Sequence, residues 1–208
     1  WIGAFEPNEE TIATVTSKLT IEQAKNMVKA NRDITKLTVI DDQFVTKYNL
    51  GSLEDTIDQL IDQMTNGNPQ QGCIVKLSCR SAKDVTPFHQ RTQNYYPEKL
   101  KLFESFIDED HTLEALQNAK VSALYESTLQ CMKVTSGKEA LDLLLRSNRI
   151  SFDLELDLRY IDQFSTHVIV RPWLWLESDA TSLHTEFRAF VNENKLTALS
   201  QYYTHCYL

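Results

Sequence analysis

The segment from residue 167 onward constrains the fold more than any other part of this chain. It contains an apolar run interrupted by one arginine, HVIVRPW at 167–173, and a second run, TEFRAFV at 185–191. The polar sequence NENK follows at 192–195, and a third run, LTALSQ, ends at 201. Apolar runs around a short polar turn are typical of antiparallel strands. We therefore expect a strand at 168–174, and a strand at 185–191 paired with 196–202.

Charged side chains inside these runs indicate a binding site. Glu186 and Arg188 are two apart in one predicted strand and therefore share a face, as Arg171 and Trp173 do in another. Two arginines, a glutamate and a tryptophan on neighbouring strands favour a site for something anionic and planar. The alternatives are a surface ion pair of little energetic value for Glu186 with Arg188, and plain core packing for Trp173.

Lys76 lies in a further predicted strand, at 73–78, within the apolar sequence CIVKL. A buried lysine is costly unless it is paired, and phosphate oxygens are one suitable partner. The alternative is an edge-strand lysine that points to water.

Three blocks of this sequence resemble the cell division cycle protein 123 family, a branch of the ATP-grasp proteins. The sequences VRPW at 170–173, EFRAFV at 186–191 and SQ at 200–201 are similar to that family's Leu-Arg-Lys-Trp, Glu-Phe-Arg-Cys-Phe-Val and Ser-Gln. VKLSCRSAKD at 75–84 is similar to its Pro-Lys-Leu-Asn-Trp-Ser-x-x-x-Asp. The segment 139–150 looks like its helix ending in Ser-Ser-Asp-Phe-Ile. The blocks follow the family's order.

The resemblance implies an α+β, ATP-grasp-like fold, in which two lobes with antiparallel sheet hold ATP between them. By the same resemblance, Lys76 lies against the nucleotide phosphates, Arg171 reaches phosphate and Trp173 walls the base pocket. Glu186 supports Arg188, which faces phosphate. The family's Mg²⁺ ligands are expected beyond residue 208, so no metal ligand is assigned here. Pro172 departs from the family pattern, where a lysine stands.

The family assists assembly of eukaryotic translation initiation factor 2 and binds its gamma subunit, so the resemblance implies a chaperone-like role linked to the cell cycle. ATP would then act as a structural clamp between lobes. Two alternatives remain open. The chain could be an ATP-dependent carboxylate-amine ligase, or a degenerate ATP-grasp module that serves as a structural subunit of a larger complex. Whether the protein is an enzyme stays undecided.

The composition of the chain limits the kinds of partner that it can be expected to bind. The net charge of −8 and the pI of about 5.1 argue against a general nucleic-acid surface and are compatible with docking a basic partner. No apolar run is long enough to span a bilayer. The four cysteines lack zinc-ligand spacing, which favours reduced thiols in a cytoplasmic protein. The five histidines show no nucleophile or metal pattern, so packed or exposed rings are expected.

The predicted organisation has a mostly helical N-terminal region of unknown role at 1–70 and an incomplete ATP-grasp-like region at 71–208. Because the chain starts at Trp1 and stops within an apolar pattern, we expect it to be part of a longer protein. The sequence predicts helices at 21–30 (behind a TIEQ capping box), 52–64, 97–106, 113–125 and 138–147. It predicts further strands at 37–40, 128–134 and 150–158, and a loop at 86–96.

Overall fold

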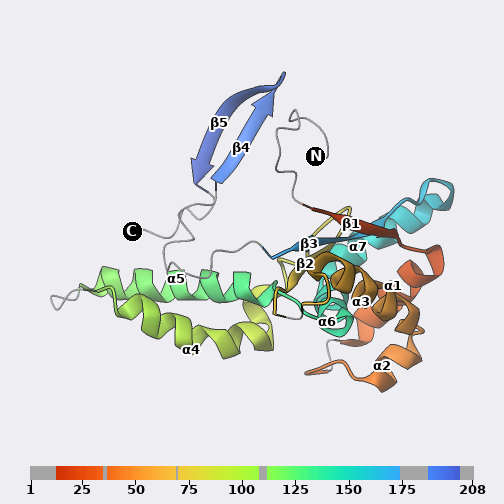
Figure 1. Ribbon diagram of the computed structural model, residues 1–208, viewed down its shortest axis with the longest axis horizontal. Coiled ribbons are helices and arrows are strands. Elements are labelled where there is room, and N and C mark those ends of the chain that lie inside the picture. The colour runs from red at the N-terminus through yellow and green to blue at the C-terminus, as the bar shows by residue number, and fades with distance from the viewer. Residues whose placement is uncertain (1–12, 35–36, 69, 108–111, 174–186, 202–208) are drawn as a thin grey trace. The chain divides into compact units, whose positions relative to one another are not determined.

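A computed structural model describes residues 13–34, 37–68, 70–107, 112–173 and 187–201 (Figure 1). The fold is α+β with small antiparallel sheets, as the sequence predicts. The chain divides into two compact units. We call residues 12–92 with 128–173 the sheet unit, and residues 1–11, 93–127 and 174–208 the hairpin unit. The boundary expected between residues 70 and 71 lies inside the sheet unit.

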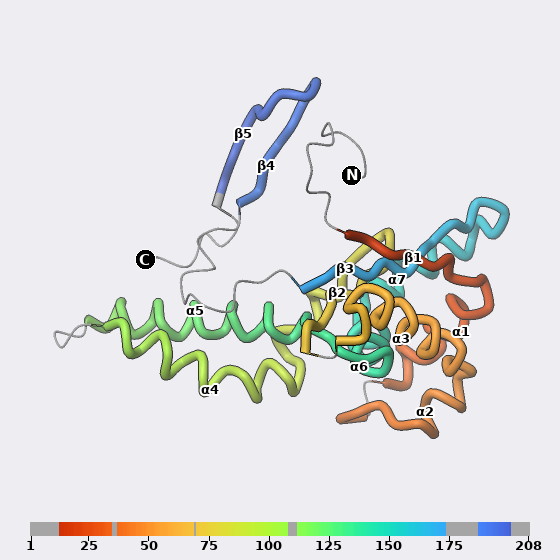
Figure 2. The backbone as a smooth tube through the Cα atoms, in the orientation of Figure 1, coloured from red at the N-terminus to blue at the C-terminus, as the bar shows by residue number. Residues whose placement is uncertain are grey.

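A three-stranded antiparallel sheet organises the sheet unit. Its strands are β1 (Val15–Lys18), β3 (His167–Pro172) and β2 (Cys73–Leu77), in that spatial order. The central strand, β3, is thus the last of these three in the sequence. In the register, Val170 lies opposite both Val15 and Val75. The tube in Figure 2 follows the chain through these strands, with β1 in red and β3 in blue.

Helices cover one face of this sheet. Helix α3 (Gly51–Thr65) packs against all three strands and against α6 (Gly137–Arg146), while α1 (Ile21–Ile34) packs against α6 and α7 (Asn148–Asp157). The predicted apolar stripe of α3 is confirmed, because its members at helical spacing are buried: Leu53, Ile57, Ile61 and Met64. They join Val75, Leu77, Val168 and Val170 in one hydrophobic core.

Side-chain caps fix where several helices begin. The predicted capping box is present, since Gln23 N–H donates to Thr20 Oγ1 at 3.1 Å and Thr20 N–H donates to Gln23 Oε1 at 2.9 Å. Ser136 caps α6 and Ser147 caps α7. A short helix that the sequence did not predict, α2 (Asp42–Lys47), begins at the Asp41 cap. The 3₁₀ turns are η1 (Thr86–Phe88) and η2 (Leu158–Gln163).

The strand expected at 37–40 is wrong. Leu37 and Thr38 pair with no strand; their carbonyl oxygens accept hydrogen bonds from the Arg146 guanidinium, each at 3.0 Å. Ile40 is buried while Val39 is 68% exposed. Ile40 holds this segment against the core, and the Arg146 guanidinium supplies hydrogen bonds that a neighbouring strand would otherwise supply.

Three further predictions of secondary structure are wrong. Residues 150–157 lie in α7 and Leu158 begins η2, so this segment is not a strand, and 128–131 continue helix α5 (Leu113–Cys131). Of the predicted strand at 128–134, Val134 alone forms an isolated bridge, to Cys73. The expected loop at 86–96 contains η1 and the start of α4 (Gln90–Glu104), so Pro97 lies inside that helix and does not begin it.

In the hairpin unit, Lys99 of α4 and Glu126 of α5 form an ion pair at 3.9 Å. Strands β4 (Phe187–Asn192) and β5 (Lys195–Gln201) form the predicted hairpin, with a bulge after Phe190. Glu193 and Asn194 adopt positive φ in its turn, a backbone conformation typical of tight hairpins. None of the helices within the described residues is long and apolar enough to cross a membrane.

Candidate functional site

The face of the sheet that points away from the hydrophobic core is basic. Strand alternation and the register put seven residues on it, which we call the basic sheet face: Thr16, Lys18, Ile74, Lys76, His167, Ile169 and Arg171. None of the described residues in β1, β2 or β3 is acidic. The face therefore carries two lysines and one arginine without an acidic side chain on the same strands, in a protein of net charge −8.

Lys76 and Arg171 are neighbours on this face. Lys76 lies opposite Ile169, and Arg171 lies opposite Ile74, so the two cations occupy diagonal positions on paired strands. Such positions are about 7 Å apart between Cα atoms, within reach of long side chains. Ile169 is only 7% exposed although it lies outside the main core. The aliphatic stems of long cationic side chains can shield such a residue while the charged ends stay in water.

The two cations have no counter-charge among the described residues. No ion pair joins either side chain to that part of the chain, and Arg171 Nε is buried there without a hydrogen-bond partner. Like charges at neighbouring cross-strand positions repel each other. An external anion is the kind of ligand that would relieve both the repulsion and the unsatisfied Nε donor.

The other predicted site residues lie elsewhere. Trp173 follows β3 directly and is 8% exposed, and its backbone N–H donates to Gly72 O at 3.2 Å. Arg188 is exposed on β4, opposite Ser200, in the hairpin unit. Glu186 lies outside the described residues. The structure thus brings Lys76 and Arg171 together in one unit and has Arg188 in the other.

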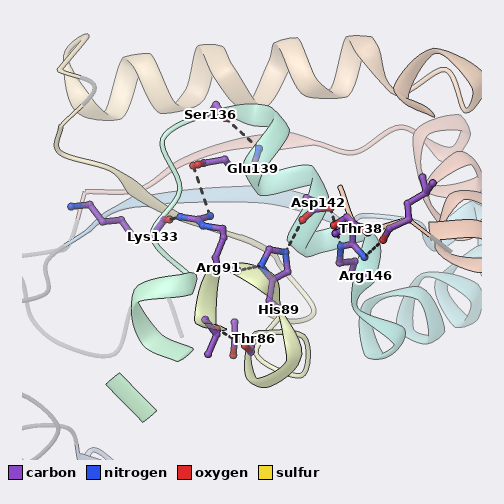
Figure 3. A network of polar contacts seen from close by, with 11 residues as sticks. Thr38, Thr86, His89, Arg91, Lys133, Ser136, Glu139, Asp142 and Arg146 are labelled. Atoms are coloured by element: carbon purple, nitrogen blue, oxygen red, sulfur yellow. Dashed lines mark hydrogen bonds and ion pairs between the residues drawn. The ribbon is translucent and has the colours of Figure 1, made fainter. Parts of the chain in front are cut away.

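A second polar cluster, which sequence reasoning missed, centres on Asp142 of α6. His89 Nε2–H donates to Asp142 Oδ2 at 2.6 Å, and Arg146 Nε donates to Asp142 Oδ1 at 2.9 Å (Figure 3). Arg146 also holds the carbonyl oxygens of Leu37 and Thr38. The i,i+4 spacing of Asp142 and Arg146 was visible in the sequence as a helix ion pair. His89 lies 53 residues from Asp142 along the chain, and no local pattern marked it.

The contacts of His89 act on its protonation in opposite directions. Burial lowers its pKa, but hydrogen bonds to Asp142 and Cys131 outweigh burial and raise the pKa to about 9. The backbone N–H of Arg91 points at Nδ1 at 3.2 Å, and only an unprotonated Nδ1 can accept it. That N–H opposes the imidazolium form, but the Asp142 carboxylate keeps the pKa of His89 above its usual 6.5.

Cys131, His89 and Asp142 share the residue types of a nucleophile, a base and an orienting carboxylate. The thiol of Cys131 is completely buried in the hydrophobic core, however. Buried thiols are inert, because attack on a substrate needs an accessible thiolate. Cys73 is also buried, and burial raises its pKa to about 11. We therefore assign this cluster no nucleophilic role.

A pocket lies beside the His89 cluster. Its volume is about 390 Å³, and its lining includes Ile34, Leu37, Val85, Phe88, His89 and Arg146. Ile34 and Val85 form a buried apolar wall, whereas Phe88 is 84% exposed. Asp84 and Asn148 also border the pocket, at the start of α7.

Two of the sequence blocks behind the family resemblance meet in space. Asp84 closes the block at 75–84, and its carboxylate accepts hydrogen bonds from Ser147 Oγ at 2.7 Å and Arg149 N–H at 3.3 Å. Arg80 of the same block forms an ion pair with Asp153 at 2.6 Å. Residues that look unrelated in the sequence thus form one contact surface between the loop after β2 and helix α7.

No group of three or more potential metal-ligating side chains occurs among the residues that the structure describes. Comparisons of this chain with protein-family models, with curated proteins and with solved structures found no match.

Proposed function

We propose that the chain is an ATP-binding, ATP-grasp-like protein and that its basic sheet face holds the nucleotide phosphates. The adjacency of Lys76 and Arg171, without a counter-charge in the described part of the chain, carries the proposal. A triphosphate supplies several anionic oxygens within a few ångströms, which matches two neighbouring cations. Arg171 would bind phosphate oxygens through its planar guanidinium, and Lys76 would act as a point charge.

The biological role proposed with this activity is assembly of eukaryotic translation initiation factor 2 through its gamma subunit. The family resemblance supports it, and two of the similar blocks contact each other through Asp84 and Ser147. In this role ATP clamps the protein without being consumed. A net charge of −8 favours a basic partner surface. Mg²⁺ would accompany the ATP phosphates, and no described residue is assigned as its ligand.

The test is titration of ATP into the protein by calorimetry, with and without Mg²⁺. Lys76→Ala and Arg171→Ala should each weaken ATP binding by about tenfold or more, since each removes a charge-assisted contact. Lys29→Ala is the matched control, because Lys29 is an exposed lysine on α1 of the same unit. ATP binding that ignores both site variants, or no ATP binding at all, would refute the proposal.

A second measurement separates the clamp from the ligase alternative. Under the proposal, bound ATP persists and ADP release stays at background. Steady ADP release that requires an added carboxylic acid and an amine would instead assign the protein to the carboxylate-amine ligases.

A further inference from the structure

We infer that the pocket beside His89 is a binding site for a small uncharged ligand with a planar aromatic ring. The site shares no residue with the basic sheet face, and the inference stands apart from the proposed nucleotide function. Its volume of about 390 Å³ falls within the range of natural small-molecule pockets, toward the small end.

The apolar part of the pocket fits a flat ring. Ile34 is fully buried and Val85 is 9% exposed, so this side of the pocket is apolar and belongs to the packed interior. Phe88 also lines the pocket but keeps 84% of its surface in water. A phenylalanine in that position gains burial and ring stacking when another ring enters. Leu37, at 36% exposure, adds a further apolar contact.

The charged groups of the His89 cluster are already paired with one another, which selects against a ligand that would need one of these charges. Asp142 accepts hydrogen bonds from both His89 and Arg146. Arg146 donates through Nε and both terminal nitrogens, to Asp142 and to the carbonyls of Leu37 and Thr38. Because Asp142 and Arg146 are paired with each other, neither of these two side chains offers an unpaired charge to a ligand.

An anion meets a specific obstacle at the start of α7. The N–H groups of a helix start are the natural anion site of such a pocket. Here the carboxylate of Asp84 already occupies it, because it accepts from Ser147 Oγ and from the Arg149 N–H. A second anion would be repelled by Asp84 and would find these donors taken. A cation would have to compete with Arg146 at Asp142, and at Asp84 it would have to compete with the two hydrogen bonds from Ser147 Oγ and the Arg149 N–H.

Three probes of nearly equal shape test this inference: benzamide is neutral, benzoate is anionic and benzamidinium is cationic at pH 7.5. Each is titrated into the ¹⁵N-labelled full chain while amide chemical shifts are followed. Benzamide should move the amides of Val85, Phe88 and His89, and it should bind more tightly than either charged analogue. No shift of these amides at millimolar benzamide, or tighter binding of a charged analogue, overturns the inference.

A pair of variants localises the binding. Phe88→Ala should weaken benzamide binding about three- to tenfold by removing the ring contact. Phe152→Ala is the matched control, because Phe152 is 59% exposed on α7 and does not line the pocket. Both rings are exposed, so neither variant should unfold the protein. Equal benzamide affinity in the two variants would show that the ring binds elsewhere.

Discussion

Asp84 and Ser147 cap helix α7 together: Ser147 Oγ donates to the Asp84 carboxylate at 2.7 Å and accepts the Ile150 N–H at 3.1 Å. A serine hydroxyl can donate one hydrogen bond and accept another at the same time. Ser147 therefore links the negatively charged Asp84 carboxylate to the N-terminus of α7, which is the positive end of the helix dipole. The loop after β2 is thereby tied to α7.

Ser147→Ala should therefore lower the free energy of unfolding by about 1–2 kcal/mol, the upper part of the usual range for a lost cap, because Ser147 is fully buried and Asp84 also loses a donor. Urea denaturation measures the change. Ser52→Ala is the control, since Ser52 lies in the first turn of α3 without capping it. Equal losses in both variants would contradict a special role for the Asp84–Ser147 pair.

The His89–Asp142 pair should make stability depend on pH. The folded-state pKa of His89 is raised from 6.5 to about 9, so the stability it adds is fully present below pH 6.5 and is lost as pH rises toward 9. His89→Gln should abolish this part of the pH profile. Chemical denaturation of wild type and variant at pH 6 and pH 9 measures it. A wild-type loss between the two pH values no larger than that of the variant would show that the pKa is not raised.

Two glycines at the first position of a helix should respond oppositely to alanine. A Cβ on Gly137 would meet the Glu54 carbonyl oxygen and Asp58 Oδ2, the latter at 2.9 Å, and the Gly137 N–H already donates to Asp58. Gly137→Ala should cost about 1–3 kcal/mol through this overlap. Gly51 has nothing within 4 Å of the added atom. Gly51→Ala should be neutral or stabilise by up to about 1 kcal/mol. Thermal unfolding of both variants checks the contrast, and equal shifts would contradict it.

Lys76→Met should raise stability in the absence of ligand. The substitution keeps the apolar stem beside Ile169 and removes the repulsion from Arg171, for a gain of up to about 0.5 kcal/mol at low salt. Screening should shrink the gain as sodium chloride rises toward 0.5 M. Lys29→Met is the control, because it changes the net charge by the same amount and lies in the same unit but outside the basic sheet face. A gain independent of salt would point to packing as its cause.

Sequence periodicity predicted the elements whose burial follows one face. Strands β2, β3 and the β4–β5 hairpin, and helices α1, α3 and α6, were located within a few residues. The segment 150–158 misled because its apolar residues alternate as in a strand. In the structure Ile150 and Leu154 are buried, but Phe152 is 59% exposed. The spacing of four and the cap at Ser147 decide for a helix, and alternation alone could not reveal either.

The candidate sites depend on contacts that the sequence does not encode locally. The position of Lys76 beside Arg171 requires the register of β2 on β3, which only the folded sheet fixes. His89 contacts Asp142 only because the folded chain brings it against α6. The segment 37–40 receives hydrogen bonds from Arg146 and not from a neighbouring strand. Those features arise from long-range pairing, which outweighs local propensity.

The strand order has a consequence for how the protein is made. During synthesis β1 and β2 leave the ribosome before β3, and in the folded sheet each bonds to β3 and not to the other. Both must wait, with open edges and unburied valines, until residues 167–172 emerge. Until β3 emerges, this sheet cannot form, and β3 then completes both of its ladders.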